Sequence, residues 1–92
     1  MQLSLPLESH YKIGCIMHAT DCRTYKTTTG TLLCVFPANE VPDKSLVAKY
    51  FGKYSFMYDK SPVTRMILQK ANGDIVAIPF NLSKWRYCCE HR

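Results

Sequence analysis

Hydrophobic and polar residues alternate near the start of the chain. Tyr11, Ile13, Cys15 and Met17 occupy every second position, and a period of two is typical of a strand with one buried face. Residues 23–28 are rich in threonine, which favours a second extended segment. Residues 31–36 place apolar side chains on both faces of an extended chain, which is typical of a central strand. We expect Thr29-Gly30 to form the turn between these last two segments.

The pattern changes to a helical one after Pro42. Leu46, Val47, Tyr50 and Phe51 have the spacing of one apolar helix face. Asp43 is a good N-cap because its carboxylate can accept an otherwise unpaired backbone N–H. Gly52 is a natural residue to end the helix. We therefore predict a short helix over residues 43–51, followed by a strand in which Tyr54, Phe56 and Tyr58 alternate.

Residues 64–71 and 74–80 predict a β-hairpin. Asn72-Gly73 is the signal for a two-residue type I′ turn, in which both residues have positive φ. This turn would place Leu68 opposite Ala77 and Ile67 opposite Ile78. Pro79 cannot donate to a ladder, so it predicts an edge or a bulge. A last strand is expected over residues 83–88.

These elements predict a small α+β protein. We expect a single domain over residues 1–92, with an antiparallel sheet of about five to six strands and the helix packed on it. The hydrophobic fraction of 47% and the charged fraction of 21% are ordinary for a globular protein. Because the sheet would have unpaired edges, strand addition could close a homodimer.

Composition indicates a cytoplasmic protein. The first eight residues lack the basic and apolar segments of a signal peptide, and no apolar run is long enough for a membrane span, so we expect no membrane association. The cysteine count is odd, which favours reduced thiols. The five cysteines are Cys15, Cys22, Cys34, Cys88 and Cys89.

The formal net charge lies in one stretch. Residues 44–70 hold six basic residues and one acid, and therefore carry the whole net charge of +5, while the rest of the chain is neutral. A concentrated basic face suits an anionic partner, which could be nucleic acid, a nucleotide-like ligand or an acidic protein surface. The residues expected to bind this partner are Lys44, Lys49, Lys53, Lys60 and Arg65.

The same stretch is rich in aromatic residues. Residues 49–60 hold five of the eleven aromatic side chains. Lysines interleaved with aromatic rings suit single-stranded nucleic acid, because the charge follows phosphates and the rings stack on bases. The predicted helix and strand faces instead place these rings in the core, which is the commoner location. We therefore expect the lysines, rather than the rings, to form the binding face.

The end of the chain suggests a second kind of interface. Trp85, Arg86 and Tyr87 are residue types that dominate protein interfaces. The alternative function is accordingly a small inhibitor or accessory protein, of the kind found in phages and mobile elements, that blocks a larger protein by direct binding. A final strand with Trp85 and Tyr87 packed inward is the simpler interpretation.

No motif indicates catalysis, and we expect no enzyme activity and no cofactor. The chain has no glycine-rich phosphate loop and no His-Glu-x-x-His motif. A zinc site would require ligands from two segments, but strand alternation sends Cys15 and His18 to opposite faces. The expectation is therefore no metal site. The residues that leave this question open are Cys15, His18, Cys22, Cys88, Cys89 and His91.

Overall fold

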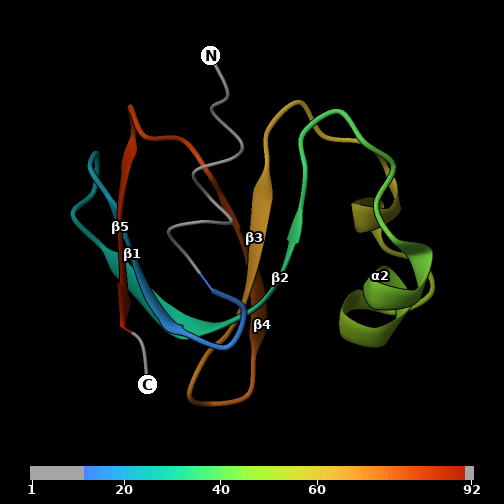
Figure 1. Cartoon of the computed structure of the whole chain (residues 1–92), viewed down its shortest axis with the longest axis horizontal. Helices are drawn as coiled ribbons and strands as arrows, with labels where there is room; N and C mark the ends of the chain where they lie inside the picture. Colours follow the sequence, from blue (N-terminus) through green and yellow to red (C-terminus); the bar gives the residue numbers. More distant parts are fainter. Residues whose placement is uncertain (1–11, 91–92) are drawn as a thin grey trace.

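The fold is one antiparallel sheet, and a short helical unit forms the connection along the chain between two neighbouring strands (Figure 1). The structure is a computed structural model that describes residues 12–90. The strand order is β4-β3-β2-β1-β5, so the predicted α+β class is confirmed. The elements are β1 (Ile16–Asp21), β2 (Thr27–Phe36), α2 (Lys44–Phe51), the 3-10 helix η1 (Phe56–Tyr58), β3 (Arg65–Gln69), β4 (Ile75–Pro79) and β5 (Trp85–Glu90).

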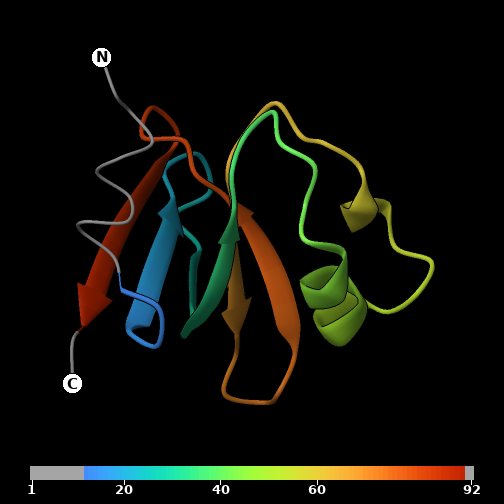
Figure 2. The same ribbon diagram turned by 45° about the vertical axis from the view of Figure 1, so that its right-hand side comes forward.

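The sheet is strongly twisted, and a short segment joins its two edge strands (Figure 2). Tyr87 of β5 fastens this connection. Its hydroxyl donates to the carbonyl oxygen of Pro79 at 2.6 Å and accepts from the backbone N–H of Asn81 at 2.8 Å. Its ring stacks on Phe80 with a centroid separation of 5.0 Å. These contacts hold the end of β4 beside β5. Pro79 is the last residue of β4, which is an edge strand of the sheet, as predicted.

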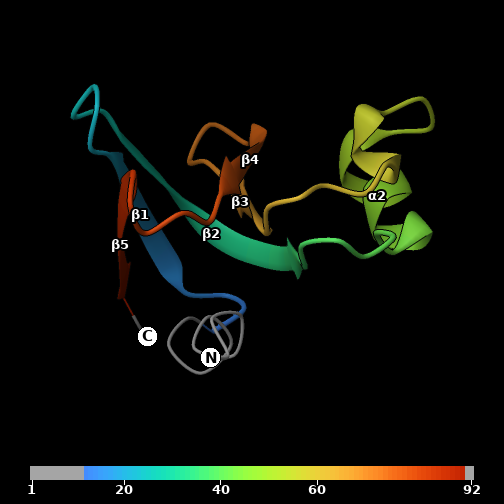
Figure 3. The same cartoon turned by 90° about the horizontal axis from the view of Figure 1, so that it is seen from above.

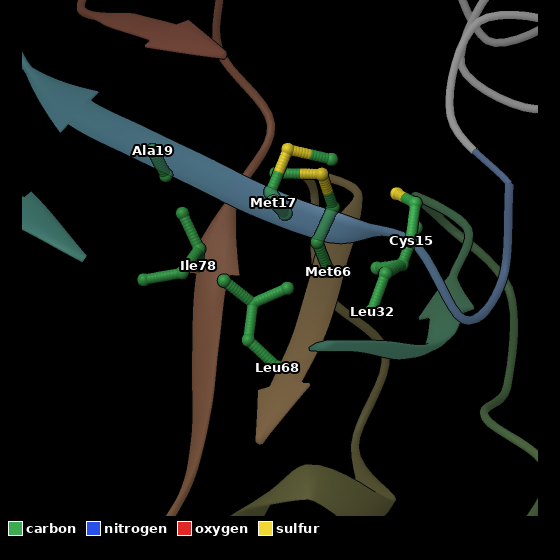
Figure 4. Close-up of a cluster of buried hydrophobic side chains, with 7 residues drawn as sticks. All are labelled: Cys15, Met17, Ala19, Leu32, Met66, Leu68 and Ile78. Carbon is green, nitrogen blue, oxygen red and sulfur yellow. The ribbon is translucent and has the colours of Figure 1, made fainter. Parts of the chain in front are cut away.

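The two faces of the sheet carry separate apolar clusters. In the first cluster, side chains from β1, β2, β3 and β4 point toward one another (Figure 4). The helix-side cluster lies on the other face, where α2 and η1 pack against β2 and β3. The first cluster contains Cys15, Met17, Ala19, Leu32, Met66, Leu68 and Ile78. The helix-side cluster contains Cys34, Phe36, Val47, Met57 and Ile67.

A register shift in β2 lets this strand contribute side chains to both clusters. Leu32 pairs with Leu68 and Cys34 pairs with Ile67, so Leu33 is an extra residue on β2. Such a bulge changes which face the following side chains occupy. Leu32 packs in the first cluster, whereas Leu33 and Cys34 both belong to the helix side. The prediction of a central strand covered on both faces is confirmed.

The predicted alternation in the first strand is confirmed for Cys15 and Met17, both of which are buried. The strand itself starts later, at Ile16, and Ile13 is exposed. Tyr11 lies outside the described residues. The last strand is shifted in the same direction, from the expected 83–88 to Trp85–Glu90.

The predicted turn at Thr29-Gly30 is wrong. β2 runs without interruption through Gly30, which pairs with Met17 of β1. The chain turns earlier, at residues 22–26, where Tyr25 has φ of 62°. Gly30 serves close packing instead, because a Cβ there would lie 2.8 Å from the carbonyl oxygen of Gln69 on β3.

The β3–β4 hairpin exists, but its predicted register is wrong by one residue. Leu68 pairs with Val76 and Ile67 pairs with Ala77. The backbone N–H of Lys70 donates to the carbonyl oxygen of Asp74 at 2.8 Å, which leaves a three-residue loop. In this type of loop a positive φ is needed at its last residue, and Gly73 has φ of 94°.

Helix α2 agrees with the prediction for residues 43–51. Asp43 is the N-cap, and its carboxylate accepts from the backbone N–H of Ser45 at 2.9 Å. Gly52 ends the helix with φ of 90° and donates to the carbonyl oxygen of Ala48. None of the helices within residues 12–90 has the length and apolar character that a membrane crossing requires.

The expectation of reduced thiols fails for one pair of cysteines. Cys15 and Cys89 form a disulfide that links the residue before β1 to β5. Within the structure Cys22, Cys34 and Cys88 remain free. Cys15 and Cys89 are far apart in the sequence, and the pairing of β1 with β5 is what brings them together. The predicted cytoplasmic location stays a prediction.

Candidate basic and aromatic surface

The helix-loop unit formed by α2 and η1 lies at one end of the molecule, far from the β1–β2 turn (Figures 1 and 3). Val47 of α2 is fully buried in the helix-side cluster, and Leu46, Tyr50 and Phe51 pack against that cluster. This apolar face turns the remaining side chains of α2 outward. Lys44 and Lys49 are consequently exposed, as the helical spacing predicts.

The strand predicted after α2, in which Tyr54, Phe56 and Tyr58 alternate, is wrong. Residues 54–58 form a turn and a single 3-10 helix instead. Ser55 caps η1, because its hydroxyl oxygen accepts from the backbone N–H of Met57 at 3.0 Å. Met57, rather than the rings beside it, fills the helix-side cluster and is fully buried.

Two aromatic rings are therefore left on the outside of this turn. Tyr54 is 92% exposed and Phe56 is 76% exposed. The expectation that these two rings belong to the core is wrong. Tyr58 differs from them, because it is half-buried and packs against the helix-side cluster.

Four lysines surround these rings along the chain and are exposed to solvent. We call them the lysine surface: Lys44, Lys49, Lys53 and Lys60. None of them forms an ion pair with a carboxylate in residues 12–90. Two of them instead contact aromatic rings, since Lys49 Nζ lies 5.3 Å from the centre of the Tyr50 ring and Lys53 Nζ lies 5.6 Å from that of Tyr54. Their positive charge is thus available to a partner.

The carboxylate closest in sequence to Lys44 is already engaged. Asp43 accepts from both the backbone N–H and the hydroxyl of Ser45, at 2.9 and 2.7 Å. These hydrogen bonds hold the pKa of Asp43 below its usual value. The group therefore stays ionised near neutral pH, where it stabilises the N-terminus of the helix.

Arg65 is placed differently from the four lysines. It is half-buried at the start of β3, and its Nη2 donates to the carbonyl oxygen of Asp59 at 3.0 Å. Its Nη1 lies 3.4 Å from Met57 Sδ. These contacts tie the segment after η1 to the sheet. A direct role of Arg65 in partner binding stays a prediction.

The residues of the alternative interface lie on β5, away from α2 (Figure 1). Trp85 and Tyr87 pack against the first cluster, and their rings are 6.5 Å apart and nearly parallel. Arg86 is exposed on the other side of the strand. The inward packing of Trp85 and Tyr87 agrees with the simpler interpretation of this segment.

The candidate metal ligands are scattered. Cys15 and Cys89 are bonded to each other in the disulfide, so neither offers a thiolate to a metal. His91 lies outside the described residues. His18 is on the opposite face from Cys15, where its ring nitrogens contact Thr29 Oγ1 and Glu90 Oε2. Among residues 12–90, no group of three or more potential ligands comes together.

His18 also has Cys88 as its direct cross-strand neighbour. A histidine beside a thiol is an arrangement that can activate a nucleophile. Here both ring nitrogens are engaged by Thr29 and Glu90 instead. The imidazole of His18 is thus fixed by polar side chains of the neighbouring strands β2 and β5.

Sequence reasoning identified the lysines but missed Tyr54 and Phe56 as surface residues. The available signal was Ser55, since serine is a frequent helix N-cap. A cap at Ser55 starts a helical turn at Phe56 and thereby ends the strand-like alternation.

Comparison with known proteins supplies no relative for this chain: no protein family, no curated protein and no solved structure matches it.

Proposed function

We propose that this protein is a non-catalytic binding protein whose lysine surface docks nucleic acid. The observation that supports the proposal is the exposure of Lys44, Lys49, Lys53 and Lys60 on one helix-loop unit, without carboxylate partners in residues 12–90. The remainder of the sequence outside residues 44–70 is neutral. Attraction to a polyanion would thus be directed to one end of the molecule.

Nucleic acid fits this surface better than a compact anion does. The lysines are spread over a helix and the loop that follows it, and neither a glycine-rich loop nor a cluster of arginines accompanies them. Separate lysines act as point charges that follow a phosphate backbone, whereas a small phosphate ligand is usually held by convergent donors. The proposed mechanism is therefore backbone contact with release of bound counterions.

The proposal predicts a measurable salt dependence. Each phosphate neutralised on a single strand contributes about −0.7 to the slope of log affinity against log salt. If all four lysines contact phosphates, the slope should be about −3. A fluorescence anisotropy titration with a labelled oligonucleotide, repeated at several salt concentrations, measures this slope.

The decisive variant is Lys49→Glu/Lys53→Glu. It reverses two charges of the lysine surface at exposed positions, so the fold should be retained. The matched control is Lys26→Glu/Lys84→Glu, which changes the net charge equally at two exposed lysines outside residues 44–70. We expect the first variant to lose at least about 10-fold in affinity at low salt and the control to lose less than about 3-fold.

Two results would contradict the proposal. One is the absence of oligonucleotide binding by the wild-type protein at low salt. The other is an equal loss of affinity in the two double variants, which would indicate attraction by net charge alone. The absence of binding would favour an acidic protein surface as the anionic partner, or the alternative of a protein that blocks a larger protein.

A further inference from the structure

The most unusual feature of the lysine surface is the pair of aromatic rings within it. Tyr54 and Phe56 are 92% and 76% exposed, and neither belongs to the first cluster or to the helix-side cluster. Other apolar residues of the same segment do pack inward, among them Phe51, Met57 and Tyr58. Neighbouring rings of this segment thus pack against the helix-side cluster, whereas Tyr54 and Phe56 stay exposed to water.

The turn that carries the two rings is held firmly. Ser55 lies between them and accepts from the backbone N–H of Met57 through its hydroxyl and from that of Tyr58 through its carbonyl oxygen, at 3.0 and 3.3 Å. The carbonyl oxygen of Phe56 accepts from the N–H of Asp59 at 3.1 Å. Because the backbone is already ordered, binding a partner to these rings costs little additional conformational entropy.

The charge around the rings specifies what they would bind. Lys53 lies over Tyr54, and Lys60 is close to Phe56 along the chain. A partner that carries flat unsaturated groups beside negative charges would contact both the rings and the lysines. Single-stranded nucleic acid has this composition, since each unstacked base has a free face and is joined through its sugar to the phosphate backbone.

We propose that Tyr54 and Phe56 stack on unpaired bases and make the protein prefer single-stranded nucleic acid to duplex. This inference rests on the proposed function, because the lysine surface supplies the backbone contacts. In a duplex the bases are already stacked on one another, so the rings gain nothing there. The lysines contribute to both forms, whereas the rings contribute only to the single strand.

The test compares a single-stranded oligonucleotide with a duplex of the same length, using the variant Tyr54→Ala/Phe56→Ala. Base stacking on an aromatic side chain is worth about 5-fold or more in affinity for each ring. We expect the variant to lose at least about 10-fold in affinity for the single strand and less than about 2-fold for the duplex. The salt dependence should stay unchanged, because no charge is removed.

Two controls separate stacking from loss of structure. Tyr54→Phe/Phe56→Tyr keeps both rings and should restore single-strand affinity. Tyr25→Asn removes an exposed tyrosine at the far end of the molecule, in a turn that also carries Arg23 and Lys26. Asparagine tolerates the positive φ of this position. This variant should bind like the wild type.

A direct readout comes from Phe56→Trp. Stacking of a base on the new indole should quench its fluorescence, whereas the native Trp85 packs against the first cluster and should change little. Quenching by the single strand but not by the duplex is the expected result.

Failure of the inference can be distinguished from failure of the proposed function. If Tyr54→Ala/Phe56→Ala binds the single strand like the wild type, or loses equally on both nucleic acids, the rings do not stack on bases, even though Lys49→Glu/Lys53→Glu still weakens binding. If the wild type binds neither nucleic acid, both proposals fall, and the exposed rings would then be assigned to a protein partner.

Discussion

Arg65 at the start of β3 donates from Nη2 to the carbonyl oxygen of Asp59 at 3.0 Å, directly beyond the end of η1. The same guanidinium places Nη1 at 3.4 Å from Met57 Sδ. Arg65 thereby contacts both buried Met57 and Asp59, the residue that follows η1. The same turn exposes Tyr54 and Phe56. The arrangement of the candidate surface consequently depends on a half-buried residue of β3.

We expect Arg65→Ala to lower the free energy of unfolding by about 1–3 kcal/mol, because hydrogen bonds from a charged group are lost. Urea unfolding measures this change. Arg65→Lys keeps the charge but cannot reproduce the planar donor arrangement. It should therefore recover little of the stability. If Arg65→Lys matches the wild type in both stability and oligonucleotide affinity, charge rather than positioning is the role of Arg65.

Gly30 should not tolerate a side chain. A Cβ at this position would lie 2.8 Å from the carbonyl oxygen of Gln69 and 3.0 Å from Leu68 Cβ, so two paired strands would have to separate. We expect Gly30→Ala to cost about 1–3 kcal/mol in urea unfolding. Thr31→Ala, on the same strand, is the control and should have a smaller effect. A neutral Gly30→Ala would mean that β2 and β3 are less closely packed than the structure shows.

The Cys15–Cys89 disulfide should account for a large part of the stability. It closes a loop with a sequence separation of 74 residues, and the chain-entropy model assigns about 4 kcal/mol to a loop of this length. Urea unfolding of Cys15→Ala/Cys89→Ala, compared with Cys88→Ala as the control, measures this contribution. Thiol titration of the unfolded wild type should detect only Cys22, Cys34 and Cys88. Detection of all five thiols would contradict the disulfide.

Cys34 should be the least reactive of the free thiols. Burial, together with the charge of Asp43, raises the pKa of Cys34 from its ordinary value of 9.0 to about 11. Little thiolate is therefore present in the folded protein at pH 8, and the thiolate is the reactive form. In alkylation followed by mass spectrometry, we expect exposed Cys88 to be modified at least about 10-fold faster than Cys34. Equal rates would contradict the burial of Cys34.

The same raised pKa makes stability depend on alkaline pH. Between about pH 9 and pH 11 the folded protein keeps a proton on Cys34 that the unfolded chain has released. The free energy of unfolding should therefore fall as the pH rises through this interval. Comparison with Cys34→Ala isolates this contribution, because other groups that titrate in the interval are shared. An identical pH dependence in the variant would contradict the prediction.

The parts of the fold that were predicted correctly depend on local chemistry. Asp43 accepts from a backbone N–H two residues away, and Gly52 reaches a positive φ without a Cβ penalty, so both ends of α2 can be read from neighbouring residues. The alternation of Cys15 and Met17 similarly indicates a buried strand face. The exposure of Lys44 and Lys49 follows from the apolar face of the same helix.

The incorrect predictions concern contacts between distant segments. Gly30 looks like a turn residue until β3 is seen to pass close to it. The spacing of Tyr54, Phe56 and Tyr58 is compatible with a strand, and only the helix-side cluster, by accepting Met57, leaves two of the rings in water. Cys15 meets Cys89 because β5 pairs with β1.

Local sequence patterns thus predicted the helix, the α+β class and the exposed positions of Lys44 and Lys49. Each of these depends on residues a few positions apart. The exposed rings, the hairpin register and the disulfide needed the folded structure, because they depend on which distant surfaces meet. The candidate surface combines the two: its lysines were predictable from the sequence, and its aromatic rings were not.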